Sequence, residues 1–292
     1  MVSFNIKWLG HYKDKENVQL AQFLAPYDLI AVQELVDPPF EGVYEDGIAY
    51  VQDQESLQFF KAMEQEGFSY WISNGDSGKE KNHIVGPTDE WSVVFYKATK
   101  LIPDSSRFYG FVDTPLVLNP VFDRVPYVFP FCSVDRKSTF SVVNLHLTQG
   151  AGAAAVQQRQ QQFQHLMTWV KSQKERNQDF LLMGDCNVYR SEELFVVHQH
   201  GYKSLNSALK PTTTTQYSSG KGNPFDHCFY GDSSQYEIIG DSFQVLDLRA
   251  WLLNQKAINM TGIAPFKNGL FSYRYSDHLP IQFLYILGID TD

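Results

Sequence analysis

Polar side chains that could take part in catalysis end or interrupt several apolar stretches of this sequence. In "FLLMGDCNV", residues 180–188, apolar residues lead directly into Asp185 and Asn187. Similar residues occur elsewhere: Asn5 in "SFNIKWL", Glu34 in "LIAVQEL", His146 in "SVVNLHL", Asp226 with His227 in "PFDHCFY", and Asp277 with His278 in "SDHLPI". Because burying an unpaired carboxylate is costly, such groups must be paired, exposed or bound to a cation. Ligand sites gather at strand ends in α/β sheets, so we expect one shared site.

These residue types indicate metal-assisted hydrolysis of a phosphate ester. Carboxylate oxygens and an Asn amide are hard ligands, which suit Mg²⁺ or Mn²⁺ better than zinc. Two histidines on separate strands, His146 and His278, each with a possible carboxylate partner, suit a general acid and a general base. Arg124 in "DRVPYV" is suited to a phosphate oxygen. A metal, a base, an acid and an arginine together are typical of phosphoester hydrolysis.

Each candidate also has a structural explanation when it is taken alone. Asn5 could satisfy backbone groups, Glu34 could cap a helix, and His146 could be a hydrogen-bonded core histidine. "GDCN" could be a turn, "SDH" an N-cap, and Arg124 a surface ion pair. All of these explanations would have to hold at once, so the functional reading is favoured.

Length, composition and charge restrict the class of protein. The chain has 292 residues, 43% hydrophobic and 20% charged, with no repeat or linker, which predicts one globular domain over residues 1–292. No apolar run approaches the roughly 20 residues that span a bilayer, so we expect no membrane insertion. The net charge of −9 argues against bulk attraction to nucleic acid, and a phosphate substrate would therefore need a cation. The start "MVSFNIKWLG" shows no leader, which leaves a cytoplasmic or a secreted protein open.

Cys132, Cys186 and Cys228 do not form a recognisable metal-binding or disulfide pattern. One disulfide is possible, but buried free thiols are favoured. Strand alternation predicts that Cys186 points away from Asp185 and Asn187, into packing.

The apolar pattern predicts two packed sheets covered by helices. Strands are expected at 2–9, 27–35, 68–73, 90–97, 124–134, 138–147, 179–187, 224–231, 236–246 and 277–287. Helices are expected at 15–26, 56–67, 153–177 and 191–201.

The ordered set of motifs resembles the endonuclease/exonuclease/phosphatase superfamily, which has the deoxyribonuclease I-like fold. The motifs that carry this resemblance are "FNIKWL", "AVQEL", "VNLHLT", "GDCN", "FDHCFY" and "SDHLP". Two more are similar to the deoxyribonuclease I branch: "DEWSVVFYK", with Glu90, and "DRVP", with Arg124. The resemblance implies an α/β fold, a four-layer α/β/β/α sandwich of two mixed sheets with helices outside.

The resemblance also implies roles for individual residues. Glu34 would be the principal metal ligand with Asn5 and Asp277 nearby, and the cofactor would be Mg²⁺, with Mn²⁺ or Ca²⁺ as alternatives. The remaining roles are catalytic or phosphate-binding. Asp226 would orient His278, the base, and Glu90 would hold His146, which would protonate the leaving oxygen or stabilise the phosphorane-like state. Asp185 and Asn187 would position water, phosphate or the metal, and Arg124 and Asn5 would contact the phosphate.

The leading hypothesis is a divalent-metal-dependent phosphodiesterase acting as a monomeric endonuclease on DNA. Alternatives with the same chemistry are a sphingomyelin or inositol phosphate head group, or a nucleotide end. A non-catalytic binding module is disfavoured because both histidines and Glu34 are present. Candidate groove residues are Lys79, Lys81, Arg190 and Lys221 for phosphates, and Tyr217 or Trp91 for stacking.

Overall fold

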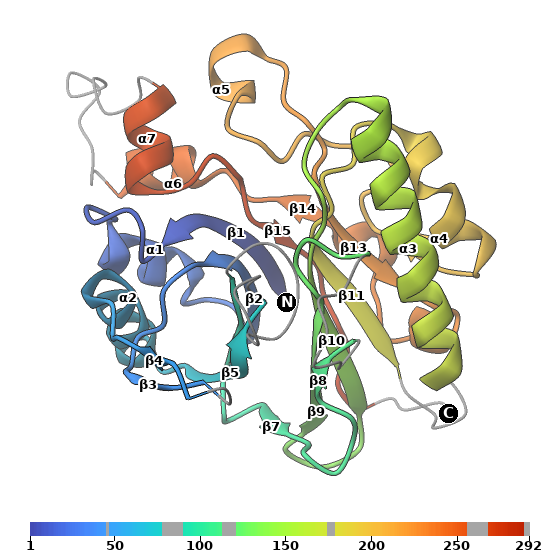
Figure 1. Cartoon of the computed structure of the whole chain (residues 1–292), viewed down its shortest axis with the longest axis horizontal. Helices are drawn as coiled ribbons and strands as arrows, with labels where there is room; N and C mark the ends of the chain where they lie inside the picture. Colours follow the sequence, from blue (N-terminus) through green and yellow to red (C-terminus); the bar gives the residue numbers. More distant parts are fainter. Residues whose placement is uncertain (45–46, 78–89, 113–120, 174–178, 256–267, 289–292) are drawn as a thin grey trace.

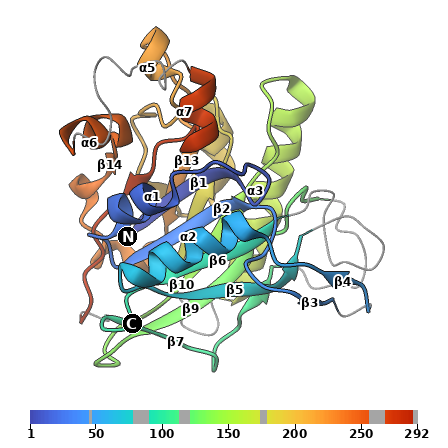
Figure 2. The same ribbon diagram turned by 90° about the vertical axis from the view of Figure 1, so that its left-hand side faces the viewer.

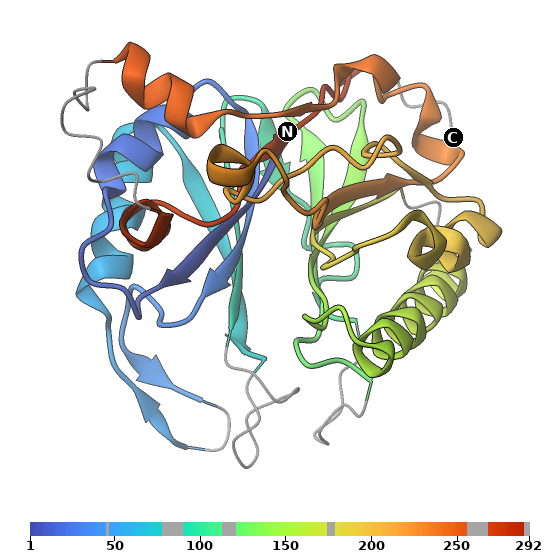
Figure 3. The same cartoon turned by 90° about the horizontal axis from the view of Figure 1, so that it is seen from above.

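The computed structural model describes residues 1–44, 47–77, 90–112, 121–173, 179–255 and 268–288. Two β-sheets pack face to face, and helices cover the outer side of each (Figure 1). Seen from above, the layers run from the blue helices through both sheets to the long yellow-green helix (Figure 3). The predicted four-layer α/β/β/α sandwich is confirmed.

The first sheet has the strand order β14-β15-β1-β2-β6-β5. Its strands are β14 (Gln244–Val245), β15 (Ile281–Gln282), β1 (Val2–Leu9), β2 (Leu29–Leu35), β6 (Trp91–Tyr96) and β5 (Ser69–Asp76). β1 and β2 are parallel, and α1 (Asn17–Leu24) connects them. Figure 2 looks onto α1 and α2 (Gln54–Gln65), which lie across this sheet. Apolar residues of α6 (Leu248–Asn254) and α7 (Asn268–Arg274) belong to the same hydrophobic cluster as those of β1, β2, α1 and α2.

The second sheet has the order β12-β13-β11-β10-β9-β7, with β8 paired to β9. Its strands are β12 (Lys203–Ser204), β13 (Asp226–Tyr230), β11 (Phe180–Asp185), β10 (Thr139–His146), β9 (Tyr127–Ser133), β7 (Leu101–Pro103) and β8 (Gly110–Phe111). β10 and β11 are parallel, and α3 (Ala153–Gln173) connects them on the outer side. Smaller elements are the β3–β4 hairpin (Gly42–Val43, Ala49–Tyr50), α4 (Phe195–Gln199) and α5 (Gln216–Ser219).

A buried polar network joins the two sheets just below the strand ends. Gln33 Nε2 on β2 donates to Asn144 Oδ1 on β10 at 2.6 Å. Asn144 Nδ2 donates to the Val32 carbonyl and to Ser92 Oγ, both at 2.8 Å. Buried polar groups with all partners satisfied fix one arrangement of their neighbours. This network therefore sets the register of one sheet against the other close to the predicted site.

Close backbone packing at Gly184 brings β10 and β11 together where they end. A Cβ atom at this position would lie 2.0 Å from the Leu145 carbonyl oxygen. Only glycine fits such an approach without moving the backbone. The glycine of "GDCN" thus allows His146 and Asp185, which are paired in register, to lie on adjacent strands.

Several predictions of secondary structure need correction. The strand expected at 236–246 is reduced to β14 and follows a 3₁₀ turn at Gly240–Ser242, because Gly-Asp-Ser favours a turn. The strand expected at 277–287 is reduced to β15, since Pro280 cannot donate to a sheet. α3 is described as far as Gln173, and 174–178 lie outside the described residues.

The cysteine predictions are confirmed. Cys132, Cys186 and Cys228 are all buried and free, and Cys186 packs in the core beside the second sheet. Among the residues that the structure describes, no helix is long and apolar enough to cross a membrane.

Candidate active site

The site begins where the two parallel strand pairs end. Asn5 on β1 donates from Nδ2 to Glu34 Oε1 on β2 at 2.7 Å. The same amide nitrogen donates to Asp185 Oδ2 on β11 of the other sheet at 3.0 Å. One side chain therefore joins the strand ends of both sheets.

The Glu34 carboxylate is held in a strained and partly desolvated position. Its backbone has φ +64°, a left-handed conformation that is costly for any residue except glycine. Its Oε2 accepts a hydrogen bond from the Trp8 backbone N–H at 3.0 Å. Burial raises the pKa of Glu34, and nearby Glu90 adds to this, although His146 and the Asn5 hydrogen bond oppose it. A carboxylate in this situation is stabilised by a positive charge next to it.

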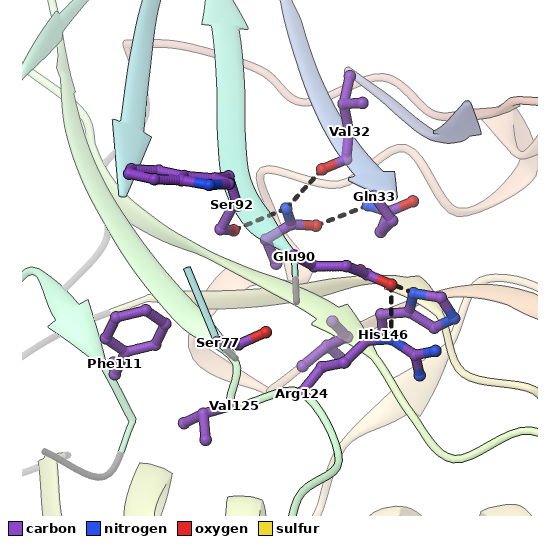
Figure 4. Close-up of a pocket in the computed structure, with 12 residues that line it drawn as sticks. Val32, Gln33, Ser77, Glu90, Ser92, Phe111, Arg124, Val125 and His146 are labelled. Atoms are coloured by element: carbon purple, nitrogen blue, oxygen red, sulfur yellow. Dashed lines mark hydrogen bonds and ion pairs between the residues drawn. The ribbon is translucent and has the colours of Figure 1, made fainter. Parts of the chain in front are cut away.

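His146 lies beside Glu90, as the resemblance implied. His146 Nδ1 is 3.0 Å from Glu90 Oε2, and Arg124 Nε is 2.5 Å from Glu90 Oε1. Figure 4 shows the Glu90 carboxylate between the imidazole and the guanidinium. Burial alone would raise the pKa of Glu90, but His146 and Arg124 lower it to about 2. Burial and Arg124 lower the pKa of His146, yet Glu90 and Asp185 outweigh them and the pKa is raised.

His278 forms the second histidine–carboxylate pair. Its Nδ1 is 2.8 Å from Asp226 Oδ2, and both side chains are buried. Burial would lower the pKa of His278, but Asp226 and Asp185 outweigh it and raise the pKa well above its usual value. The carboxylate fixes the ring so that Nε2 points away from Asp226, toward Asp185.

Asp185 lies between the two imidazoles. Its Oδ2 is 3.5 Å from Nε2 of His146 and 3.5 Å from Nε2 of His278. Its Oδ1 accepts a hydrogen bond from the Asn187 backbone N–H at 3.0 Å. Asn187 has φ +50°, and its Nδ2 donates to the Leu147 carbonyl at 3.1 Å. The two histidines therefore face one another across a carboxylate, which is a symmetric arrangement for moving protons on either side of a bound group.

The donor atoms fit a divalent cation. Glu34, His146 and Asp185 each offer a ligand atom, and these atoms lie within 4.8 Å of one another. Asp185, Asp226 and His278 form a second such group. Oxygen-rich sets with one imidazole suit Mg²⁺ or Mn²⁺. We infer that Glu34 and Asp185 would hold the ion.

Asp277 does not join these groups. Among the described residues it belongs to neither cluster of possible ligands, and its Oδ2 forms an ion pair with Lys7. Asn5 lies where a ligand was predicted, but its Oδ1 accepts a hydrogen bond from the Lys7 backbone N–H at 2.9 Å and its amide nitrogen faces the carboxylates. The predicted set of Glu34, Asn5 and Asp277 is thus brought together only in part.

A cleft of about 330 Å³ opens over these groups. Besides the predicted residues, its described lining includes side chains that the motifs did not identify as contacts: Lys7, Trp8, Tyr12, Gln149, Thr213, Thr215, Asn223 and Phe225. Thr213, Thr215 and Asn223 belong to the loop that also contains Lys221, which was expected to contact phosphates, and all three line the cleft. Gln149 follows His146 by three residues, which is the only sequence signal that could have found it.

The residues that were predicted to line a substrate groove differ in where the structure places them. Lys79 and Lys81 lie outside the described residues, while Arg190 and Lys221 are exposed. The prediction that Trp91 stacks on a substrate is wrong. Trp91 is 2% exposed and packs against Phe40. Its side chain faces the helix-covered side of the first sheet.

A buried ion pair behind the cleft holds two of its loops. Arg159 on α3 donates to Glu193 from Nε at 2.9 Å and from Nη2 at 2.6 Å. Its Nη1 donates to the carbonyls of Thr148 and Gly150, in the loop after His146. Glu193 Oε1 accepts from the backbone N–H of Tyr189, in the loop after Asn187. The long helix therefore positions the loops that follow β10 and β11.

His227 adjoins Asp226 in sequence but points away from the site. It is fully buried, 2.8 Å from Ser204 Oγ and 2.9 Å from the Pro224 carbonyl, and burial lowers its pKa from 6.5 to about 4.

The buried His227 makes the stability of the fold depend on pH. Between pH 6.5 and pH 4 the unfolded chain binds a proton at His227 that the folded protein does not. Stability therefore falls as the pH drops from 6.5 to 4, by about 3 kcal/mol from this residue. Urea unfolding at pH 7 and pH 4.5 should show a smaller loss for His227→Gln than for wild type. An equal loss for His227→Gln and wild type, with exposed His11→Gln as control, would contradict this assignment.

Comparison with known proteins identifies the family. The model of the endonuclease/exonuclease/phosphatase family matches residues 2–278. The chain belongs to this family. Members of the endonuclease/exonuclease/phosphatase family are phosphoesterase hydrolases that generally use divalent metals. No curated protein sequence matches the chain.

Solved structures with the same fold include three from bacteria. An endonuclease/exonuclease/phosphatase family protein from Bacteroides thetaiotaomicron is 18% identical, with a TM-score of 0.62 over 99% of this chain and 97% of that one. The mannosyl-6-phosphatase Bt3783 of the same species is 18% identical, with a TM-score of 0.61 over 98% of each chain. A 3′-5′ exonuclease from Neisseria meningitidis is 15% identical, with a TM-score of 0.54 over 97% of this chain and 98% of that one. Identities this low show the fold alone.

Proposed function

We propose that this protein is a divalent-metal-dependent phosphodiesterase that cleaves DNA, as an endonuclease. The observation that carries the proposal is the pair of buried histidines, each bonded to its own carboxylate and each 3.5 Å from Asp185. Diester hydrolysis needs a proton removed from water and a proton given to the leaving alkoxide. Two histidines on opposite sides of one carboxylate can supply both transfers.

In this mechanism His278 accepts the proton of the attacking water at Nε2, while Asp226 holds Nδ1 and stabilises the imidazolium. His146 donates a proton from Nε2 to the leaving oxygen, and Glu90 holds its Nδ1. Arg124 and Asn187 line the same cleft and would hold the phosphate oxygens. A cation at Glu34 would neutralise the phosphate charge.

Two features support a nucleic-acid substrate. The cleft wall formed by Thr213, Thr215 and Asn223 offers hydroxyl and amide groups, which commonly contact sugar and phosphate in DNA complexes. A solved structure of the Neisseria 3′ phosphatase with the same fold contains a product DNA hairpin.

A substrate panel tests the proposal. The purified protein would be given a DNA oligonucleotide, bis-p-nitrophenyl phosphate, p-nitrophenyl phosphate, sphingomyelin and inositol phosphates, each in Mg²⁺ and in EDTA. We expect hydrolysis of the oligonucleotide and of bis-p-nitrophenyl phosphate in Mg²⁺, with the oligonucleotide preferred. Hydrolysis confined to a monoester, to sphingomyelin or to an inositol phosphate would overturn the substrate assignment and keep the metal chemistry.

A further inference from the structure

A group of aromatic rings lies at one edge of the catalytic cleft. The rings of Trp8 and Tyr12 have centroids 5.4 Å apart, and those of Tyr12 and Tyr273 are 4.4 Å apart. His11 packs edge-on against Trp8 at 5.4 Å. Trp8 and Tyr12 line the same cleft as Glu34 and His278. We call Trp8, His11, Tyr12 and Tyr273 the aromatic edge.

Core packing does not account for Trp8. It is 45% exposed, whereas the other four tryptophans, all among the described residues, are buried or half-buried. It belongs to neither of the two hydrophobic clusters that form the core. A single exposed apolar residue needs no explanation, but a tryptophan grouped with other rings at the mouth of a polar cleft is typical of a binding surface.

The backbone holds Trp8 in place beside the metal-binding carboxylate. Lys7 and Trp8 have φ of +57° and +51°, and the pairing of β1 with β2 shifts register between Asn5 and Leu9. Non-glycine residues in this conformation are strained, and strain of this kind concentrates at functional sites. The Trp8 N–H donates to Glu34 Oε2, and its carbonyl accepts from the N–H groups of His11 and Tyr12. The backbone of Trp8 is therefore fixed relative to Glu34, and the contacts with His11 and Tyr12 restrict the ring.

The cleft offers few charged side chains for the parts of a substrate beyond the cleaved phosphate. Of its described lining residues, the basic side chains are Lys7 and Arg124, and each is already ion-paired, with Asp277 and Glu90. Affinity for the parts of a substrate next to the cleaved phosphate must then come from uncharged contacts. Stacking of a base on an aromatic side chain contributes about 1–3 kcal/mol and needs no charge.

We propose that the aromatic edge, through Trp8, is a stacking subsite for an unpaired nucleobase adjacent to the cleaved phosphate. This inference rests on the proposed function, because it names the part of the nucleic acid that the same site recognises. A base can stack on a protein ring only when its face is free. The subsite therefore favours single-stranded or frayed DNA over an intact duplex.

A thermodynamic cycle between protein and substrate tests the subsite. Wild type, Trp8→Ala and Trp8→Phe would be assayed for kcat/KM on a single-stranded oligonucleotide. The same three proteins would be assayed on oligonucleotides with one abasic nucleotide, placed in turn on each side of the cleaved bond. We expect Trp8→Ala to lower kcat/KM about 10- to 100-fold on the intact strand, and Trp8→Phe to keep most of the activity. At one of the two positions, the abasic nucleotide should lower kcat/KM of wild type by a similar factor. It should lower kcat/KM of Trp8→Ala by much less, because the two changes remove the same contact.

Control measurements distinguish failure of the proposed subsite from failure of the proposed function. Tyr236→Ala removes an exposed aromatic ring outside the cleft lining and should behave as wild type on every substrate. Thermal shift with Mg²⁺ shows whether Trp8→Ala preserves the Glu34 site. Equal losses for Trp8→Ala on intact and abasic strands, or no loss at all, would overturn the subsite alone. A wild-type protein that hydrolyses no nucleotide diester would overturn the proposed function and the subsite with it.

Discussion

Replacing His278 with asparagine is expected to lower kcat on a DNA substrate by about 10²- to 10⁴-fold, the usual contribution of a general base. The ring lies 2.8 Å from Asp226 and is buried, so no water or neighbouring side chain can take its place with the same geometry. KM should change little, because the imidazole acts on the water rather than on the bound strand. Steady-state kinetics in Mg²⁺ measures both constants.

Two comparisons make this result specific. Asp226→Asn should lower kcat less than His278→Asn, since the ring remains but loses the carboxylate that fixes it. His198→Asn, on an exposed position of α4, serves as the matched control and should retain full activity. If His278→Asn kept more than about half of wild-type kcat, the assignment of His278 as base would be wrong.

Replacing Glu34 with glutamine is expected to remove both activity and the response to metal. A bound metal stabilises the transition state by several kcal/mol, so its loss should decrease kcat/KM by roughly 10³-fold. A ligand that binds only the folded state raises the melting temperature. Mg²⁺ should therefore raise the melting temperature of wild type and leave that of Glu34→Gln unchanged. Because burial raises the pKa of Glu34, its charge opposes folding at neutral pH. The metal-free variant should therefore melt no lower than metal-free wild type.

Differential scanning fluorimetry over a Mg²⁺ titration checks this prediction. Glu64→Gln changes an exposed glutamate on α2 and is the matched control, which should respond to Mg²⁺ as wild type does. A Glu34→Gln protein that Mg²⁺ still stabilises by the same amount would show that the ion binds elsewhere.

The sequence was informative where a polar residue breaks an apolar strand. Asn5, Glu34, His146, Asp185 and His278 each stand out in this way, and the structure brings all of them to one edge of the two sheets. Burial makes such residues conspicuous, because an apolar strand has no other reason to contain them. The layered fold followed from the same strands and from the amphipathic helices between them.

Other features depend on backbone geometry that residue types do not reveal. Positive φ at Lys7, Trp8 and Glu34 coincides with the register shift between β1 and β2, and Trp8 lies at the cleft. Asp277 has the right chemistry for a ligand, yet Lys7 occupies its carboxylate. Trp91 alternates to the helix-covered face and is buried there. Each of these outcomes is decided by tertiary contacts between segments distant in sequence.

The most direct test of the proposed chemistry uses closed circular DNA, which has no ends. Supercoiled plasmid and circular single-stranded DNA would be incubated with wild type in Mg²⁺, in Mg²⁺ with excess EDTA, and with His278→Ala in Mg²⁺. The proposed function predicts nicking or linearisation only by wild type in free Mg²⁺, with the single-stranded circle cut faster. Intact circles in all three reactions, or cleavage that His278→Ala retains, would contradict it.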